Sequence, residues 1–429
     1  MKGTDMSSES NLAIHKARWV VPVSSPPILN GAVAVFGENV VAVGKASEIQ
    51  LQFHGAIEIE DHGDAILCPA LINAHSHLEL SPLKHRLSPA GSFTEWVKSL
   101  IKARDKIDFD EWLPSIEMAV DEMIGNGVIA VGDVANNGII PLLTRENGVF
   151  WPLRGVIFKE IINPGARDVD LTDDVYLEKD IDFEFSYSAH SLFSVNPETV
   201  RQIKALDTKR GVPFSIHVAE SPEEIQYLKE GTGPIKDLLE EKGHSSADIK
   251  IPHISPVKYL HRLGVLDEDT ICVHGVHLNR EDMEILSKSQ ATVCLCPRSN
   301  IFLGVGISPS YELHSMGINL ALGTDSLASN DMLSIFAEMS SLSKCTPSLS
   351  PEAIFKAATL GGANALGLSR EKASFKRKNG FLGSLEPGST ATFISVRADN
   401  LANDNEIFEY LVNASSSSDF ESYWIVPSI

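Results

Sequence analysis

The sequence predicts a (β/α)8 barrel with a small β-sandwich domain formed from both chain termini. Three observations lead to this prediction. Eight short apolar runs alternate with longer amphipathic segments, short β-rich stretches occur near both ends of the chain, and chelating or acidic side chains follow several of the apolar runs. The first pattern is typical of βα units around a parallel sheet, and the third is typical of the active-site face of such a barrel.

Both terminal regions contain short β-rich runs separated by turns, as in a small β domain. Runs at 18–23, 32–36 and 39–43 are separated by turns, and similar short runs occur at 383–396 and 423–426. We therefore expect residues 1–65 and 380–429 to form one small β-sandwich.

The central region, residues 66–379, is expected to form the barrel. Its candidate strands are residues 66–73, 128–133, 155–159, 183–188, 213–218, 270–273, 291–296 and 318–323. Eight is the number of strands that this barrel requires.

Helix boundary signals support the alternation. Asn196-Pro197 predicts a helix start and Gly211 its end, while Ser221-Pro-Glu-Glu224 is a capping box for a helix that ends at Gly231. The segment 231–254 is an addition between the fifth and sixth strands. Its role is not apparent from its sequence.

Composition excludes several classes of partner. The 429 residues contain 36 Lys and Arg against 57 Asp and Glu, a net charge of −21. Such acidity argues against nucleic-acid and anionic-membrane surfaces, which attract Lys and Arg, so we expect a small-molecule substrate. Five cysteines give no disulfide framework, and no signal peptide or membrane span is expected, which favours the cytoplasm. A homo-oligomer is compatible with this sequence.

Two histidines follow the first candidate strand. His75 and His77 are two residues apart, so on a strand both imidazoles point to the same side. Alone, this pair is as consistent with polar loop residues as with a metal clamp.

Other strand ends favour the metal. The fifth strand ends in His217-Val-Ala-Glu220, the sixth in His274-Gly-Val-His277, and Asp325 follows the eighth. His75, His77, His217 and Asp325 would give three nitrogens and one oxygen, a set suited to one divalent ion. Zinc is favoured, and iron and manganese suit the same ligands.

The sequence resembles the amidohydrolase superfamily, in its cytosine/adenosine-deaminase-like branch. The resemblance lies in the motifs above and in Pro69-Ala-Leu-Ile-Asn-Ala-His-Ser-His77, Pro297-Arg-Ser-Asn300 and Gly323-Thr-Asp-Ser326. Within that branch, His77-Leu-Glu-Leu-Ser81 and Gly91-Ser-Phe-Thr-Glu-Trp96 are similar to the aminodeoxyfutalosine deaminases of menaquinone biosynthesis.

The resemblance implies roles for the site residues. Glu220, His274 and Asp325 would be catalytic: Glu220 would move protons between the attacking water and a ring nitrogen, and His274 would hold the water or the developing oxygen. His190 and Glu79 would contact substrate. The alternative for His190 is a polar residue at a strand end that bonds to a neighbour, and Glu79 could equally cap the following loop. Arg298 is a candidate for a substrate carboxylate, with a surface ion pair as its alternative.

The expected reaction is hydrolytic deamination of a purine-type heterocycle, with aminodeoxyfutalosine as the first candidate substrate. The alternatives are S-adenosylhomocysteine, adenosine, guanine or a chlorinated triazine. An alternative of another class is a metal-binding barrel without catalysis, which would lack a general acid such as Glu220.

Overall fold

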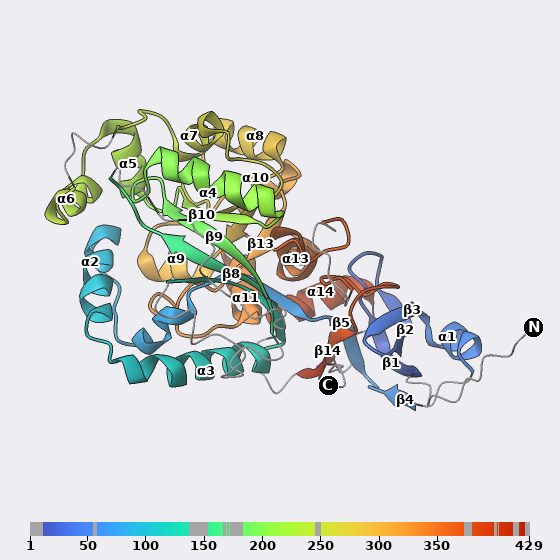
Figure 1. Ribbon diagram of the computed structural model, residues 1–429. Coiled ribbons are helices and arrows are strands. Elements are labelled where there is room, and N and C mark those ends of the chain that lie inside the picture. The colour runs from blue at the N-terminus through green and yellow to red at the C-terminus, as the bar shows by residue number, and fades with distance from the viewer. Residues whose placement is uncertain are drawn as a thin grey trace, which may run out of the picture.

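The computed structural model contains a barrel of parallel strands with a second β-sheet beside it (Figure 1). It describes residues 12–54, 58–136, 153–165, 169, 171, 183–244, 250–372, 380–398, 401, 403–414 and 420–424. In Figure 1 the terminal sheet lies at one side of the barrel, and helices α2 and α6 lie at the other.

The barrel sheet has eight strands in chain order. They are β6 (Leu71–Ser76), β7 (Val128–Ala135), β8 (Arg154–Ile161), β9 (Phe183–Ser191), β10 (Phe214–Val218), β11 (Thr270–His274), β12 (Thr292–Leu295) and β13 (Leu320–Leu322). Neighbouring strands pair in parallel. A parallel bridge between Ser76 and Asp325 brings the first and last strands together, so the barrel is nearly closed. The predicted barrel is confirmed.

Helices follow the strands. They are α2 (Phe93–Arg104), α3 (Phe109–Gly125), α4 (Pro197–Arg210), α5 (Pro222–Glu230), α6 (Pro234–Glu241), α7 (Pro256–Leu263), α8 (Arg280–Ser289), α9 (Pro297–Leu303), α10 (Ser310–Ser315), α11 (Ile335–Cys345), α12 (Pro351–Lys356), α13 (Gly362–Ala365) and α14 (Asp404–Asn413), with a 3-10 turn η1 (Leu78–Leu83) and a π-helical turn η4 (Ala357–Gly361). Within the described residues, no helix is long and apolar enough to cross a membrane.

The predicted helix boundaries around β10 agree with the structure. The Asn196 side chain accepts from the backbone N–H of Thr199 at the start of α4, and Gly211 ends that helix in the left-handed region at φ 72°. Helix α5 begins after Ser221 and ends at Gly231, which has the same φ of 72°. The segment 231–254 contributes helix α6, and its residues 245–249 lie outside the described part.

Strands from both chain ends form the second sheet. Its members are β1 (Leu12–Val20), β2 (Ile28–Phe36), β3 (Asn39–Lys45), β4 (Glu58–Asp61), β5 (Ala65–Pro69), β14 (Thr392–Arg397) and β15 (Phe420–Trp424). The order is β15-β14-β5-β1-β2-β3, with β4 also paired to β1, so all seven strands belong to a single hydrogen-bonded sheet. Helix α1 (Ala46–Gln52) follows β3. The last two residues of the expected run 423–426 lie outside the described residues.

The first candidate strand, 66–73, is divided between the two sheets. Its first half is β5, which pairs with β1 and β14, and its second half is the barrel strand β6. Pro69 ends β5, and because proline has no N–H it cannot continue a hydrogen-bonded ladder. Both halves are buried, so the apolar run is continuous along the sequence. Hydropathy alone therefore does not show that the chain passes from the terminal sheet to the barrel sheet at this point.

The terminal sheet packs against the barrel. Trp19, Ile66 and Ile394 belong to the same buried cluster as the barrel strands, whereas Leu67 and Phe393 belong to a smaller cluster within the terminal sheet. The sheet therefore buries side chains on both faces.

Candidate active site

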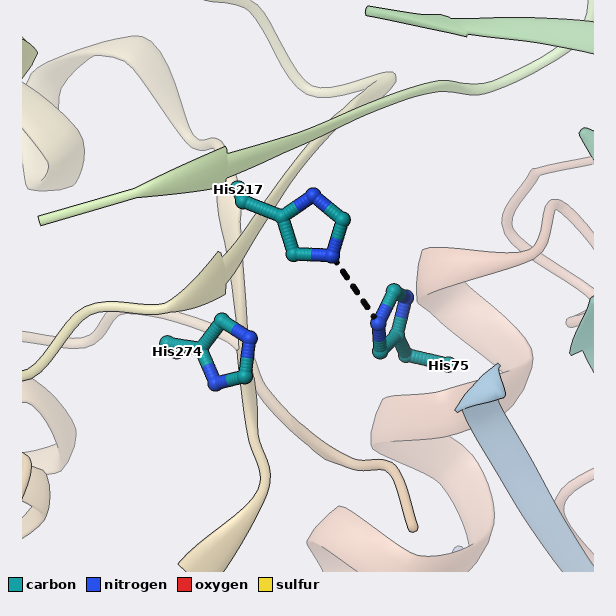
Figure 2. Close-up of side chains that lie close together, drawn as sticks. All are labelled: His75, His217 and His274. Carbon is teal, nitrogen blue, oxygen red and sulfur yellow. Dashed lines mark hydrogen bonds between the residues drawn. The ribbon is translucent and has the colours of Figure 1, made fainter. Parts of the chain in front are cut away.

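The predicted ligands meet at the C-terminal ends of the barrel strands. His75 is in β6 and His77 follows it, His217 is in β10, and Asp325 follows β13. All four are buried, with exposures between 1% and 8%. Figure 2 shows the rings of His75 and His217 directed toward one another, with His274 beside them. Gly323 allows the chain after β13, which carries Asp325, to lie close to His75, because a Cβ at position 323 would lie 2.8 Å from the Cβ of His75.

The spacing of these donor atoms suits one metal ion. Nε2 of His217 lies 3.3 Å from Nε2 of His75 and 3.4 Å from Nε2 of His77. Oδ1 of Asp325 lies 3.9 and 3.8 Å from the same two nitrogens. Ligands at 2.0–2.1 Å from a tetrahedral zinc ion lie about 3.3 Å apart, so small movements would bring all four onto one ion. The donor set therefore fits a zinc-like metal.

In His217 and His274, a hydrogen bond at Nδ1 determines that the other ring nitrogen, Nε2, faces the site. Nδ1 of His217 lies 2.7 Å from the backbone oxygen of His190, and Nδ1 of His274 lies 2.9 Å from Oδ1 of Asn300. Because both partners are acceptors, each Nδ1 carries the proton. Both Nε2 lone pairs are then directed to the centre of the cluster.

Two hydroxyl groups orient Asp325. Oδ2 accepts hydrogen bonds from Ser299 at 2.6 Å and from Ser329 at 3.1 Å. Oδ1 remains directed toward His75 and His77. Such support of a metal ligand by neighbouring donors is typical of metal centres.

The backbone is strained at three positions around this cluster. His274, Ala219 and Asp325 have φ values of 72°, 53° and 55°. The left-handed region is uncommon for residues other than glycine, and such strain concentrates at functional sites.

The turn at Ala219 places Glu220 in the site. On a continuing strand Glu220 would face away from His217, but β10 ends at Val218 and the chain turns through Ala219. Oε1 of Glu220 then lies 3.5 Å from Nε2 of His274. This geometry is what the prediction for Glu220 requires.

Glu224 stabilises the same turn. Its carboxylate accepts from the backbone N–H groups of Ala219 at 3.0 Å and Glu220 at 2.8 Å. In a capping box, the Glu224 carboxylate would accept from the backbone N–H of Ser221, which is the N-cap residue. The Ser221 hydroxyl accepts from the backbone N–H of Glu224 as expected. The Glu224 carboxylate, however, bonds to Ala219 and Glu220, the two residues before Ser221.

Burial sets the protonation of these groups. It lowers the pKa of His75 and of His217 well below the ordinary value, so both imidazoles are neutral and able to bind a metal. Burial, with the nearby Asp325, raises the pKa of Glu220 well above its ordinary value. Burial also lowers the pKa of His190 to about 4.

The cluster opens into a cavity with a largely apolar wall. Its apolar lining comes from α2, α6 and the loops after the strands, and comprises Leu80, Phe93, Trp96, Val97, Leu100, Ile101, Ile162, Pro164, Phe193, Ile235, Leu238 and Leu239. The cavity is also lined by Arg104, Lys242 and His244, which are basic or titratable residues. Glu220, His274 and Asp325 line it as well.

The predicted substrate contacts separate into two groups. Glu79 and His190 line the cavity, but Arg298 does not. Glu79 also accepts from Asn136 and lies 3.3 Å from Arg104, while Nδ1 of His190 contacts the Ser194 hydroxyl at 2.6 Å.

Arg298 matches the alternative interpretation, an ion pair. Its guanidinium contacts Asn330 at 3.0 Å and also Asp331, and it lies 3.8 Å from Glu338. These partners lie in the chain after β13, and they hold the Arg298 side chain of α9 away from the cavity. The geometry therefore does not support a substrate contact for Arg298.

Family comparison agrees with this architecture. The amidohydrolase family model matches residues 66–415, which include the whole barrel. The chain belongs to the amidohydrolase family. It is a hydrolase that acts on carbon–nitrogen bonds.

Known amidohydrolases resemble the chain over most of its length. An aminodeoxyfutalosine deaminase of Deinococcus radiodurans is 29% identical over 353 residues, 79% of this chain and 81% of that protein. A 5-methylthioadenosine/S-adenosylhomocysteine deaminase of Moorella thermoacetica is 27% identical over 426 residues, 94% of this chain and 90% of that protein.

Solved amidohydrolase structures share the fold. Helicobacter pylori aminofutalosine deaminase with methylthio-coformycin has a TM-score of 0.78 at 21% identity, covering 94% of this chain and 97% of that one. A zinc-bound adenosine deaminase from Xanthomonas campestris has a TM-score of 0.76 at 22% identity, covering 96% and 91%.

Four further residues of this amidohydrolase were not assigned roles from the sequence. Ser299 and Asn300 lie in the Pro297-Arg-Ser-Asn300 motif, so their position was visible although their partners were not. Glu160, in β8, lines the cavity, and its Oε1 is buried without a hydrogen-bond partner within the described residues. Burial raises the pKa of Glu160 to about 7. Lys242 lies in the segment 231–254, which now has a place at the cavity.

His277 has a structural contact. Its Nε2 lies 2.7 Å from the backbone oxygen of Val305, which ties the chain after β11 to the chain after α9.

Proposed function

We propose that this amidohydrolase is a metal-dependent deaminase of an adenine nucleoside, with aminodeoxyfutalosine as its substrate. The observation that supports the proposal is the convergence of three elements beside one cavity: the side chains of His75, His77, His217 and Asp325, which could hold a metal ion, the carboxyl group of Glu220 and the imidazole of His274. A barrel that only bound metal would have no need of Glu220 on a strained turn held by Glu224.

His75, His77, His217 and Asp325 would hold one divalent ion, for which zinc is the first candidate. When bound, the ion makes a nucleophile available at neutral pH by lowering the pKa of a water molecule from 15.7 to about 7. The metal identity is an inference from the ligand types.

The residues of the chain supply the proton transfers. In the overall reaction, water adds to the ring carbon that carries the amino group, the carbon–nitrogen bond breaks and ammonia leaves. Glu220 would take one proton from the attacking water and give it to the adjacent ring nitrogen. It would then take the remaining proton of the added hydroxyl group and give it to the departing amine, so that the ring carbon is left as a carbonyl and ammonia leaves. General acid–base help of this kind contributes about 10²–10⁴ in rate.

His274 and His190 would orient the reacting groups. Nδ1 of His274 is committed to Asn300, so its Nε2, which lies 3.5 Å from Glu220, can contact the oxygen that develops on the ring carbon. Nδ1 of His190 contacts Ser194, which leaves its other ring nitrogen for the substrate.

The cavity wall supports an extended nucleoside. Aminodeoxyfutalosine carries an aryl carboxylate on the sugar arm, a group with an apolar face and an anionic end. Phe93, Trp96 and Leu239 provide apolar surface, and Lys242 and His244 provide a basic edge. The D. radiodurans relative, named as an aminodeoxyfutalosine deaminase, supports the same substrate.

A second candidate is 5′-methylthioadenosine or S-adenosylhomocysteine. The M. thermoacetica relative, which matches 94% of this chain, is named for those substrates, and an apolar wall also suits a methylthio group. Adenosine, guanine and chlorinated triazines are weaker candidates because they would leave the apolar wall uncovered.

A substrate panel tests the proposal. Ammonia release by the metal-loaded enzyme would be measured with aminodeoxyfutalosine, methylthioadenosine, S-adenosylhomocysteine, adenosine, guanine and a chlorotriazine. We expect kcat/KM for aminodeoxyfutalosine to exceed the others by at least tenfold. Faster turnover of another purine nucleoside would replace the substrate and keep the reaction class, and no ammonia from any of them would overturn the reaction class.

A further inference from the structure

The terminal sheet brings two histidines and a glutamate together, away from the barrel's cavity. His15 is in β1 and Glu60 is in β4, and these two residues are direct partners in the parallel pairing of the two strands. His62 follows the end of β4. The three side chains offer ligand atoms that all lie within 4.8 Å of one another.

The atoms of this cluster have the spacing of a metal site. Nδ1 of His15 lies 3.2 Å from Nε2 of His62 and 3.2 Å from Oε2 of Glu60. Nε2 of His62 lies 4.0 Å from Oε1 of Glu60. The four-residue cluster of the barrel shows a comparable range, from 3.3 to 3.9 Å. Tetrahedral zinc ligands lie about 3.3 Å apart, so the spacing of the terminal cluster is also compatible with such an ion.

Proton accounting favours a cation between these atoms. A neutral imidazole has one N–H and one lone pair, and an ionised carboxylate has only acceptors. A proton on His15 Nδ1 can donate to His62 or to Glu60, and a proton on His62 Nε2 can donate to His15 or to Glu60, so neither tautomer gives each of the three contacts a proton of its own. A metal ion would instead accept one lone pair from each of the three groups.

The surroundings fix the two imidazoles in place. The His62 side chain is only 3% exposed, and its backbone N–H donates to the oxygen of Lys16 at 2.9 Å. The His15 ring packs edge-on against Phe393, with ring centroids 4.9 Å apart.

Glu60 is the adaptable member of the cluster. Its side chain is 38% exposed, so it can move by the few tenths of an ångström that bring it onto an ion, and solvent can complete the coordination. The carboxylate of Glu58, two residues earlier on β4, adds negative charge near His15. An imidazole pair with a carboxylate is a ligand set that zinc accepts.

We propose that His15 Nδ1, His62 Nε2 and Glu60 form a second divalent transition-metal site, of the zinc class, in the terminal sheet. A bound ion would clamp β4 and the residue after it to β1. The site shares no ligand with the active site and is independent of the substrate proposed above.

The test counts zinc ions on the full-length protein. After equilibrium dialysis against Zn²⁺, elemental analysis is expected to give two ions per wild-type chain. H62Q and E60Q should each bind one ion, with deaminase activity unchanged. The Asp325→Asn variant should also bind one ion per chain. The double variant Asp325→Asn/H62Q should bind none.

Substitutions of exposed residues outside both clusters serve as controls, and Co²⁺ absorption is a second probe of metal binding. His314→Gln and Glu48→Gln replace exposed residues outside both clusters and should retain two ions. In the Asp325→Asn background, Co²⁺ should give an absorption band that H62Q and E60Q remove. If H62Q does not fold, the more exposed E60Q carries the comparison. One zinc ion per wild-type chain, or two ions in both H62Q and E60Q, would overturn the proposal.

Discussion

Oδ1 of Asn300 lies 2.9 Å from Nδ1 of His274 and so determines which nitrogen of that imidazole faces the cavity. Asn300 is in α9, the helix that follows β12, while His274 ends β11. The contact therefore joins two neighbouring βα units at the point where Glu220 approaches His274. In the proposed mechanism Asn300 would act on the reaction through His274, as a positioning residue.

Asn300→Ala is expected to lower kcat by about 10–100-fold, because the His274 ring loses the acceptor that fixes its tautomer and orientation. Metal content should not change. Asn300→Asp, which keeps an acceptor, should recover part of the activity. The double variant Asn300→Ala/His274→Ala should be no slower than His274→Ala alone, and additive losses would show that Asn300 acts elsewhere.

Ser299 and Ser329 are expected to control metal affinity through Asp325. Replacing either serine by alanine removes one of the two hydroxyl donors to Oδ2, so the carboxylate is less firmly oriented. Loss of such a donor typically weakens metal binding by about 10–100-fold. Competition with a chelator measures this affinity, with Ser315→Ala, on the exposed side of α10, as the control. Equal affinities in all variants would contradict the assigned role.

Lys242 is expected to select substrates with an anionic arm. Lys242→Met keeps the aliphatic stem and removes the charge, and since the residue is exposed we expect KM for aminodeoxyfutalosine to rise by up to about fivefold. KM for methylthioadenosine, which has no carboxylate, should not change. Lys236→Met on helix α6, outside the cavity lining, is the matched control. A similar rise for both nucleosides would indicate a general loss of packing.

Much of the site was visible in the sequence because chemistry and strand ends coincide. Chelating residues occur where apolar runs stop, and a barrel brings these points to one face. His75, His77, His217 and Asp325 are therefore found together as expected. The role of Glu220 came from the family resemblance, and Ser221-Pro222 is consistent with it because the strand has to end there for Glu220 to turn toward the site.

The parts that were not predictable depend on contacts between distant segments. Arg298 follows a barrel strand, like the true site residues, but Asn330 and Asp331 hold its side chain outside the cavity. No local pattern reveals those partners. The division of residues 66–73 between two sheets was hidden for a similar reason, because burial on both sides of Pro69 gives an unbroken apolar run.

Asp207 is expected to make stability depend on pH. It is buried, one of its oxygens has no hydrogen-bond partner within the described residues, and burial raises its pKa well above the ordinary value. The unfolded chain loses this proton near pH 3.9, whereas the folded chain retains it to higher pH. The stabilisation is present in full at low pH and is lost as pH rises through the folded pKa.

Asp207→Asn removes this titration. The free energy of unfolding, measured in urea at several pH values from 5 to 9, should fall more steeply with pH in the wild type than in the variant. Asp237→Asn, on the surface helix α6, should follow the wild-type slope. Parallel slopes for wild type and Asp207→Asn would contradict the raised pKa.

The central claim, that a metal centre and Glu220 together catalyse deamination, is tested most directly by Glu220→Gln. Metal content and ammonia release would be measured on the same preparation, with aminodeoxyfutalosine and the other nucleosides as substrates. The account predicts the same number of metal ions per chain as in the wild type and a loss of about 10²–10⁴ in kcat. Undiminished turnover by Glu220→Gln, or turnover by wild-type protein stripped of metal, would contradict it.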